Sequence, residues 1–456
     1  MTRLWDRGEP LDEVVARLTV GNDPSLDRLL VAHDALASAA HATMLEGLGV
    51  VSSDEREVLH RELRSIADDA RSGDFDIDPE DEDGHTAIEN RLTEKLGDPG
   101  RKIHTGRSRN DQVIAALRLW GREALLTVYA SVLELIDALA ERSSEHAETV
   151  LPGYSHTRQA MPTTFGHWLR AHAESLADDL PWLRRAYEHL NRSPLGSASG
   201  FGVALDLDRE LVAELLGFDG VQVNTLAVQN DRGKSEWLAV GAAVAVATDL
   251  GRLAGDLIWL SSDELRFVRL PQRLTTGSSI MPQKRNPDVL ELIRAGAASL
   301  RARQAEIAAV YAPLGSGYHR DLQLTKEPFL DGLTLAADLV RAMRAVVEGF
   351  EVDAERARAA LLPATGATDV LYSNVASGQP FRTAYREIAG DPDGAVADDS
   401  SEAWRSRTHL GAPGSTTDPS PAAPQDARAW WSSQAERNRS TWERFGRRDH
   451  ESGSTS

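Results

Sequence analysis

Apolar residues recur at helical spacing along most of the chain. The clearest run is 111–147, DQVIAALRLWGREALLTVYASVLELIDALAERSSEHA, where apolar side chains return every three to four residues and no proline intervenes. At ~1.5 Å per residue this predicts a rod of about 50 Å. The same spacing predicts four more long helices, over 163–191, about 235–268, 288–312 and about 327–346. We therefore expect an all-α protein.

The segment SEWLAVGAAVAVATDLGRLAGDLIWL (235–260) is apolar on most of its circumference and rich in small residues. A helix that is apolar nearly all round must be buried on several sides. The simplest structure that buries it is a central bundle of very long helices. Association of several copies would cover the apolar faces that one chain leaves open.

The pattern also predicts three domains. Residues 1–105 read as a smaller helical domain with an acidic loop, DFDIDPEDEDG. Residues 106–355 contain the long-helix bundle. Residues 356–456 read as a small helical domain in which a flexible linker of Pro, Ser and Ala precedes an amphipathic helix and a polar tail.

Composition narrows the functional class. The 456-residue chain has no cysteine, which excludes disulfides, thiolate metal sites and cysteine nucleophiles. Its net charge of −20 disfavours a nucleic-acid partner. The N-terminal segment lacks a signal peptide's apolar run, and no apolar stretch reaches the ~20 residues that span a bilayer. We therefore expect a cytoplasmic protein without a membrane partner.

The basic residues are strongly biased towards arginine. Of 50 Lys and Arg residues only five are lysine. An acidic, lysine-poor surface is typical of a protein that works in high salt, and we favour this halophilic interpretation. Codon bias in a GC-rich genome is the alternative. Under either interpretation the lysines that persist are informative, and three of the five, Lys102, Lys284 and Lys326, lie in or beside the polar segments described next.

Four polar segments lie at the ends of the predicted long helices: HTGRSRNDQ (104–112), GYSHTRQAMP (153–162), LTTGSSIMPQKRNP (274–287) and GSGYHRDLQLTKEP (315–328). GSSIMPQKRNP resembles the signature loop of the fumarase/aspartase superfamily, and HTGRSRNDQ resembles more specifically the argininosuccinate lyases within it. The other two segments, with LDRLLVAHD and ATDVLYSNVASGQPFR, are also similar to that family. The likeness covers most of residues 20–390.

This resemblance implies a fumarase/aspartase-like fold and a homotetramer in which three subunits contribute to each site. It also implies a C–N lyase that splits argininosuccinate into arginine and fumarate, the last step of arginine synthesis. Such a reaction removes a proton next to a carboxylate and expels nitrogen from the neighbouring carbon. The charge that develops on the carboxylate needs cationic and amide donors, but no metal or other cofactor.

Family resemblance assigns the catalytic roles. Ser278 would be the base, which requires that cations and backbone N–H groups stabilise its deprotonated form. Lys284 and Asn286 would hold the succinyl carboxylate. His156 would protonate the leaving nitrogen, and Glu291 would orient it as a carboxylate does in a catalytic triad. The predicted substrate-binding residues, besides Asn286, are Asp23, Ser25, His85, Arg109, Asn110, Ser155, Tyr318, Gln323 and Lys326.

Some positions depart from the family pattern. Ser155 replaces the usual threonine, and Asp23 falls where the family usually has a serine, so either Asp23 or Ser25 could take that role. SPLGSASGFG and QNDRGKSEW also differ from the commoner forms. A sister lyase that releases fumarate from another N-substituted aspartate or succinate therefore remains an alternative. A non-catalytic structural protein on the same scaffold is a second one, disfavoured by the intact catalytic set.

Overall fold

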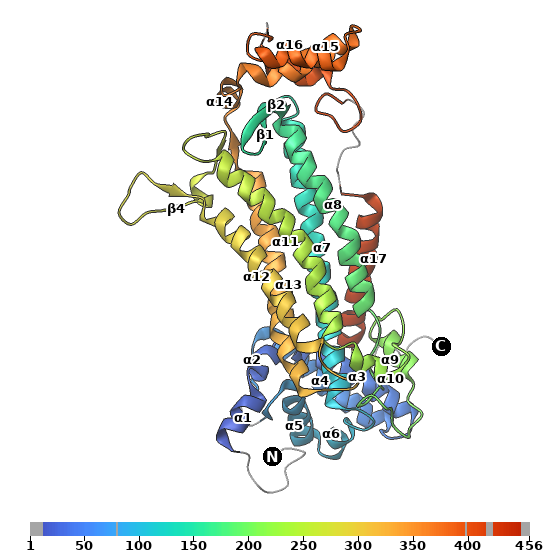
Figure 1. The fold of residues 1–456 in the computed structure, drawn as a ribbon. Helices are drawn as coiled ribbons and strands as arrows, with labels where there is room; N and C mark the ends of the chain where they lie inside the picture. The colour runs from blue at the N-terminus through green and yellow to red at the C-terminus, as the bar shows by residue number, and fades with distance from the viewer. Residues whose placement is uncertain (1–11, 79–80, 397–398, 416–422, 448–456) are drawn as a thin grey trace.

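The computed structural model describes residues 12–78, 81–396, 399–415 and 423–447. Five long helices form an elongated bundle at the centre of the molecule (Figure 1): α7 (Arg109–Glu145), α8 (Phe165–Leu190), α11 (Lys234–Leu260), α12 (Asp288–Tyr311) and α13 (Lys326–Gly349). Their buried faces supply most of the largest hydrophobic core. The all-α expectation is confirmed.

The start of α7 is fixed by its own sequence. The Ser108 hydroxyl accepts a hydrogen bond from the backbone N–H of Asn110 at 3.3 Å, and the Asp111 carboxylate accepts one from the N–H of Ser108 at 2.9 Å. This reciprocal cap satisfies N–H groups that a helix start leaves unpaired. It places Arg109 and Asn110 on the first turn of a helix whose 37 residues span about 55 Å.

Helix α11 is long and apolar enough to cross a membrane, by length and composition alone. It instead packs against α8, α12 and α13, with residues such as Val240, Leu250 and Leu257 buried. The predicted helix over 235–268 was too long at its C-terminal end. The helix stops at Leu260, and the Phe267 N–H bonds back to the Leu260 carbonyl at 2.9 Å, which turns the chain into β3 (Val268–Arg269).

Shorter helices lie at the two ends of the bundle. At the lower end in Figure 1 lie α1 (Glu13–Val20), α2 (Asp23–Asp27), α3 (Val31–Gly47), α4 (Ser53–Ser72), α5 (Gly84–Leu96), α6 (Asp98–Lys102), α9 (Arg209–Leu215) and α10 (Thr225–Asn230). At the upper end lie α14 (Ala354–Ala359), α15 (Ala367–Ala376) and α16 (Phe381–Gly390). Each end has a hydrophobic cluster of its own.

The last helix, α17 (Gln425–Gly446), packs back along α7. The Trp431 indole donates to the Leu126 carbonyl at 3.1 Å, and the Trp442 indole donates to the Glu123 carboxylate at 2.5 Å. The three-domain division stays a prediction. Helix α17 packs on the bundle helix α7 rather than on α15 and α16. Residues 416–422 of the predicted linker (412–426) and the whole predicted tail (449–456) lie outside the described residues.

In the described part of the chain, three small antiparallel sheets lie between the helices. Helical periodicity did not predict them. They pair β1 (Val150–Ser155) with β2 (Arg158–Thr164), β3 with β6 (Glu351–Val352), and β4 (Thr276–Gly277) with β5 (Arg285–Asn286). Two of the polar segments singled out in the sequence therefore lie on hairpins. A hairpin holds a loop at a defined angle, which an unstructured connection would not do.

Candidate functional site

The predicted site residues fall into three groups, one at the lower end of the bundle and two towards its upper end (Figure 1). The first, which we name the basal cluster, contains Asp23, Ser25, His85, Arg109, Asn110, Tyr318, Gln323 and Lys326 at the lower end of the bundle. The second is the tip of the β1–β2 hairpin, with Ser155 and His156. The third is the β4–β5 loop, with Ser278, Lys284 and Asn286, followed by Glu291 on the first turn of α12.

Lys326 is the most deeply buried charge of the basal cluster. Its side chain is 2% exposed, and its Nζ lies 2.6 Å from Asp27 Oδ1 and 3.0 Å from Asp23 Oδ1. Burial opposes the charged form, but the two carboxylates outweigh it and raise the pKa of Lys326. Burial also raises the pKa of Asp23. A substrate carboxylate that approached Lys326 would therefore compete with Asp23 for the ammonium group.

A second buried pair lies beside the first. His85 Nδ1 is 2.5 Å from Asp34 Oδ2, and both side chains are nearly excluded from solvent. Burial alone would lower the pKa of His85, but the Asp34 carboxylate raises it to about 9. Asp27 Oδ2 accepts the backbone N–H of Gly84 at 3.0 Å, which fixes the start of α5 and hence the place of His85.

Arg109 and Gln323 are held by their neighbours. Arg109 donates to the Thr86 hydroxyl at 3.0 Å and lies 3.3 Å from an Asp83 carboxylate oxygen. The Gln323 amide donates to the carbonyls of Thr19 and Val20, both at 3.1 Å. Asn110 follows Arg109 on the first turn of α7 and is half-buried. Tyr318 is half-buried and Ser25 is exposed.

The β1–β2 hairpin presents His156 to solvent. Ser155 pairs with Arg158 across a two-residue turn in which both His156 (φ 53°) and Thr157 (φ 58°) adopt positive φ. Non-glycine residues rarely adopt this conformation, and such outliers gather at functional sites. The Gln159 amide anchors the hairpin by donating to the Ala360 carbonyl at 2.7 Å.

The β4–β5 loop supplies donors to Ser278. Its Oγ accepts backbone N–H groups from Ile280 at 3.3 Å and from Met281 at 3.1 Å. Two N–H dipoles aimed at one oxygen favour its negatively charged form. The side chains of Lys284 and Ile280 project from the loop and are exposed, Ile280 to 82%. Glu291 is also exposed and does not reach the His156 of its own chain.

The long helices keep the basal cluster apart from the other two groups. Helix α7 separates Asn110, at its start, from the hairpin that follows its end, over about 55 Å. Helix α12 runs for 24 residues, about 36 Å, between the β4–β5 loop and the segment with Tyr318. The structure thus unites the basal cluster within one chain, but not with His156 or Ser278. Among the described residues, no group of three or more His, Asp and Glu side chains could hold a metal ion.

Sequence reasoning missed Asp27 and Asp34, the two buried acids that position Lys326 and His85. Both occur in the segment LDRLLVAHD, whose family likeness was noted without a role for either acid. Asp27 is the last residue of α2 and Asp34 lies in the first turn of α3, so the two acids come from consecutive helices. Acidic side chains are rarely buried without partners, so two of them in a short, largely apolar segment were the available signal.

Comparison with known proteins identifies the family. Residues 17–301 match the lyase family. The chain is 44% identical to an argininosuccinate lyase of Sorangium cellulosum over 90% of this chain and 96% of the relative. It is 41% identical to one of Thermotoga neapolitana over 85% of this chain and 97% of the relative.

Solved structures share the fold. The crystal structure of EDDS lyase in complex with formate superimposes with a TM-score of 0.80 at 24% identity, covering 96% of this chain and 95% of that one. A class II fumarase from Schistosoma mansoni has a TM-score of 0.70 at 17% identity, covering 85% and 95%. On the strength of the sequence matches, this chain belongs to the argininosuccinate lyase family of the fumarase/aspartase superfamily.

Proposed function

We propose that the protein is an argininosuccinate lyase, a C–N lyase that eliminates fumarate from argininosuccinate and leaves L-arginine. The observation that carries the proposal is identity above 40% to curated argininosuccinate lyases over almost their whole length. The segments RSRND and GSSIMPQKRNP are intact within that match. We place the enzyme in the cytoplasm and in arginine biosynthesis.

The base in this proposal is Ser278. A free serine is far too weak an acid to give up its proton near neutral pH, so its alkoxide must be stabilised. The N–H groups of Ile280 and Met281 already point at its Oγ, and Lys284 on the same loop adds a positive charge. Removal of the substrate proton leaves extra charge on the adjacent carboxylate, which Lys284 and Asn286 would bind.

The acid in this proposal is His156, which would return a proton to the nitrogen as the C–N bond breaks. Glu291 would orient its imidazole and stabilise the charged form. Because these two side chains do not meet in one chain, the pair would form between neighbouring copies. His156 is exposed at the tip of the hairpin, as a contact with another subunit requires.

The basal cluster would bind the substrate. Arg109 offers a planar pair of donors that fits a carboxylate, and Asn110 and Gln323 offer directional hydrogen bonds. Ser155, on the β1–β2 hairpin, would add a further hydrogen bond from another copy. The remaining predicted substrate contacts are Tyr318, Lys326, His85 and one of Asp23 and Ser25. Asp23 already neutralises part of the Lys326 charge, so it is well placed to receive a cationic group of the substrate instead.

A homotetramer would complete the site. If the separated groups of predicted site residues act together, at least one partner copy must contribute, and the long helices leave apolar surface exposed for it. On α12, for example, Leu292 is 68% exposed. Closed symmetric assembly of identical chains brings different ends of neighbouring bundles together. Light scattering that shows a fully active monomer would contradict this part of the proposal.

One assay tests the proposed function. Fumarate absorbance is followed with argininosuccinate, adenylosuccinate, aspartate and malate in separate reactions, at low and at molar salt. We expect turnover with argininosuccinate alone. Turnover with another of these substrates would establish the sister-lyase alternative, and no turnover by a folded tetramer would favour the non-catalytic alternative.

A further inference from the structure

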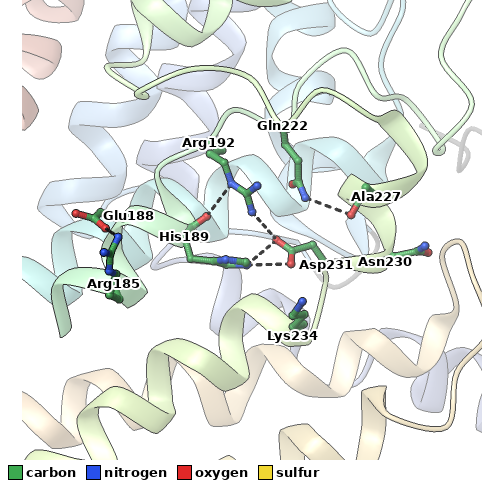
Figure 2. A pocket seen from close by; sticks show the side chains of 9 residues that line it. All are labelled: Arg185, Glu188, His189, Arg192, Gln222, Ala227, Asn230, Asp231 and Lys234. Carbon is green, nitrogen blue, oxygen red and sulfur yellow. Dashed lines mark hydrogen bonds and ion pairs between the residues drawn. The ribbon is translucent and has the colours of Figure 1, made fainter. Parts of the chain in front are cut away.

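A cationic pocket lies on the molecule outside all three groups of predicted site residues. It opens between the C-terminal end of α8, the end of α10 and the start of α11, and has a volume of about 630 Å³ (Figure 2). This is within the range of pockets that hold small molecules. Its lining residues are Arg185, Glu188, His189, Arg192, Gln222, Ala227, Asn230, Asp231 and Lys234.

The charges of this pocket are unbalanced. The two carboxylates already have cationic partners: Glu188 is paired with Arg184 and Arg185, each at 2.8 Å, and Asp231 with Arg118 at 2.8 Å. Among the lining residues, Arg185, Arg192 and Lys234 outnumber these two carboxylates, and His189 lies beside them. Such a surplus is unexpected in a chain with a net charge of −20. It gives the pocket a positive potential that favours anions.

Asp231 is shared among several cations and neutralises Arg192 only in part. His189 Nε2 lies 2.9 Å and 3.1 Å from the two carboxylate oxygens of Asp231, and the buried Arg118 binds the same group. The nearest Arg192 nitrogen is 3.8 Å from Asp231, beyond hydrogen-bond distance, and its Nε makes only a long bond of 3.4 Å to the His189 carbonyl. Its terminal N–H groups thus remain free to bind a ligand.

Lys234 supplies the second free cation. It is exposed at the first residue of α11 and forms no ion pair with the described part of the chain. It is also one of only five lysines in the sequence. The pocket side chains with amides are already engaged, since Asn230 bonds Ser316 and Gly317, and Gln222 bonds Arg118 and the Ala227 carbonyl. Recognition would therefore rest on charge rather than on neutral donors.

We propose that this pocket binds a small, multiply charged anion whose negative oxygens lie close together, as in a phosphorylated metabolite or a polycarboxylate. Arg192 would bind two oxygens of one group with its planar guanidinium, and Lys234 would bind a neighbouring oxygen. A singly charged ion such as chloride would engage only one of these cations. The site contains none of the predicted catalytic residues, so it would be a second site on the enzyme.

Calorimetric titration of the full-length protein tests the proposal. Pyrophosphate and citrate are titrated separately at constant ionic strength set with KCl, so that general screening of an acidic protein does not register as binding. We expect saturable binding of one of them, weakened about tenfold or more by Lys234→Met and by Arg192→Gln. Binding of pyrophosphate alone identifies a phosphate ligand, and binding of citrate alone a polycarboxylate.

The matched control is Lys95→Met, which removes an exposed lysine far from the pocket that pairs with Glu62 at 2.9 Å. It should leave the affinity unchanged, and thermal melts of all three variants should confirm folding. The absence of saturable binding by either anion would overturn the proposal. An equal loss in Lys95→Met would do so as well. Neither outcome depends on catalysis, so failure here leaves the proposed lyase activity untouched.

Discussion

Asn110 and His156 lie at opposite ends of the same 37-residue helix, Asn110 on its first turn and His156 on the hairpin that follows its last. About 55 Å of α7 separates them, whereas a substrate the size of argininosuccinate spans only a fraction of that distance. Both residues belong to segments that match the family. In the proposed enzyme, a complete site would therefore take Asn110 from one chain and His156 from another.

Replacing Ser278 should remove turnover without disturbing assembly. In Ser278→Ala the loop loses an oxygen that accepts the N–H groups of Ile280 and Met281, but the side chain is small and partly exposed, so the structural cost should be slight. General acid–base groups contribute roughly 10²–10⁴-fold to rate. We expect kcat to fall by at least that range while the melting temperature stays the same.

The control for this variant is Ser279→Ala, which changes the exposed neighbouring serine and should keep most of the activity. Steady-state kinetics and thermal melts of the two proteins decide the point. If Ser278→Ala retains more than about a tenth of the wild-type rate, the β4–β5 loop is only a lid and the base lies elsewhere.

Breaking the buried Lys326–Asp27 pair should destabilise the fold. Asp27→Asn leaves the Lys326 ammonium, which is 2% exposed, with Asp23 as its only carboxylate partner. Removing one partner of a buried pair typically costs about 3–5 kcal/mol, and Asp23 should reduce that to the lower end. Urea unfolding monitored by circular dichroism measures the loss. Asp76→Asn, which removes the partner of exposed Arg28, should cost less than about 1 kcal/mol.

The protein should lose stability as pH rises from about 7.5 to 9. The folded-state pKa of His85 is about 9, against about 6.5 in an unfolded chain. A group whose pKa is raised on folding stabilises the fold fully below its unfolded pKa, and that contribution disappears as pH rises through the folded pKa. Burial, with Asp249 and Asp178, raises the pKa of Asp179 to about 7, so its titration is largely complete below this window.

Urea midpoints at pH 7.5 and pH 9 measure this effect, which should amount to at most about 2 kcal/mol for one group over this interval. His85→Gln keeps a donor towards Asp34 but cannot titrate. Its stability should be lower at pH 7.5 and should change little up to pH 9. A wild-type decrease that the variant reproduces in full would assign the pH dependence to other groups.

Stability should rise with salt. The chain has 70 Asp and Glu residues against 50 Lys and Arg, so its copies repel one another at low ionic strength. Raising KCl from ~0.1 M to ~1 M shortens the Debye length from ~10 Å to ~3 Å. We expect the melting temperature and the tetramer fraction to increase over that range. A flat or falling melting temperature would contradict the halophilic interpretation and leave codon bias as the explanation of the missing lysines.

The long helices could be predicted because an apolar spacing of three to four residues survives in sequence whatever the tertiary contacts are. The end of α11 could not, because Phe267 lies in register with the helical pattern but bonds back to Leu260. The β1–β2 hairpin was also missed, since its turn uses His156 and Thr157 where a glycine or asparagine would have signalled it.

The predicted site residues came from motif resemblance, which carries residue types but not their partners. It could not show that Lys326 is paired with two aspartates or that His85 is paired with Asp34, because those contacts link α2 and α3 to segments distant in the sequence. Nor could motif resemblance show which site residues lie at the same end of the helix bundle. That depends on helix length, which the sequence did contain: 37 residues of α7 already place Asn110 far from His156.

Mixing two inactive variants tests the shared site most directly. Asn110→Ala removes a substrate contact, and His156→Asn removes the proposed acid with a residue that tolerates positive φ. Each should be nearly inactive alone. If each site takes the two residues from different chains, equal and random mixing should restore about a quarter of wild-type activity, because one arrangement in four contains both intact residues. No gain over the separate variants, in mixtures that native mass spectrometry shows to be hetero-oligomers, would contradict the account.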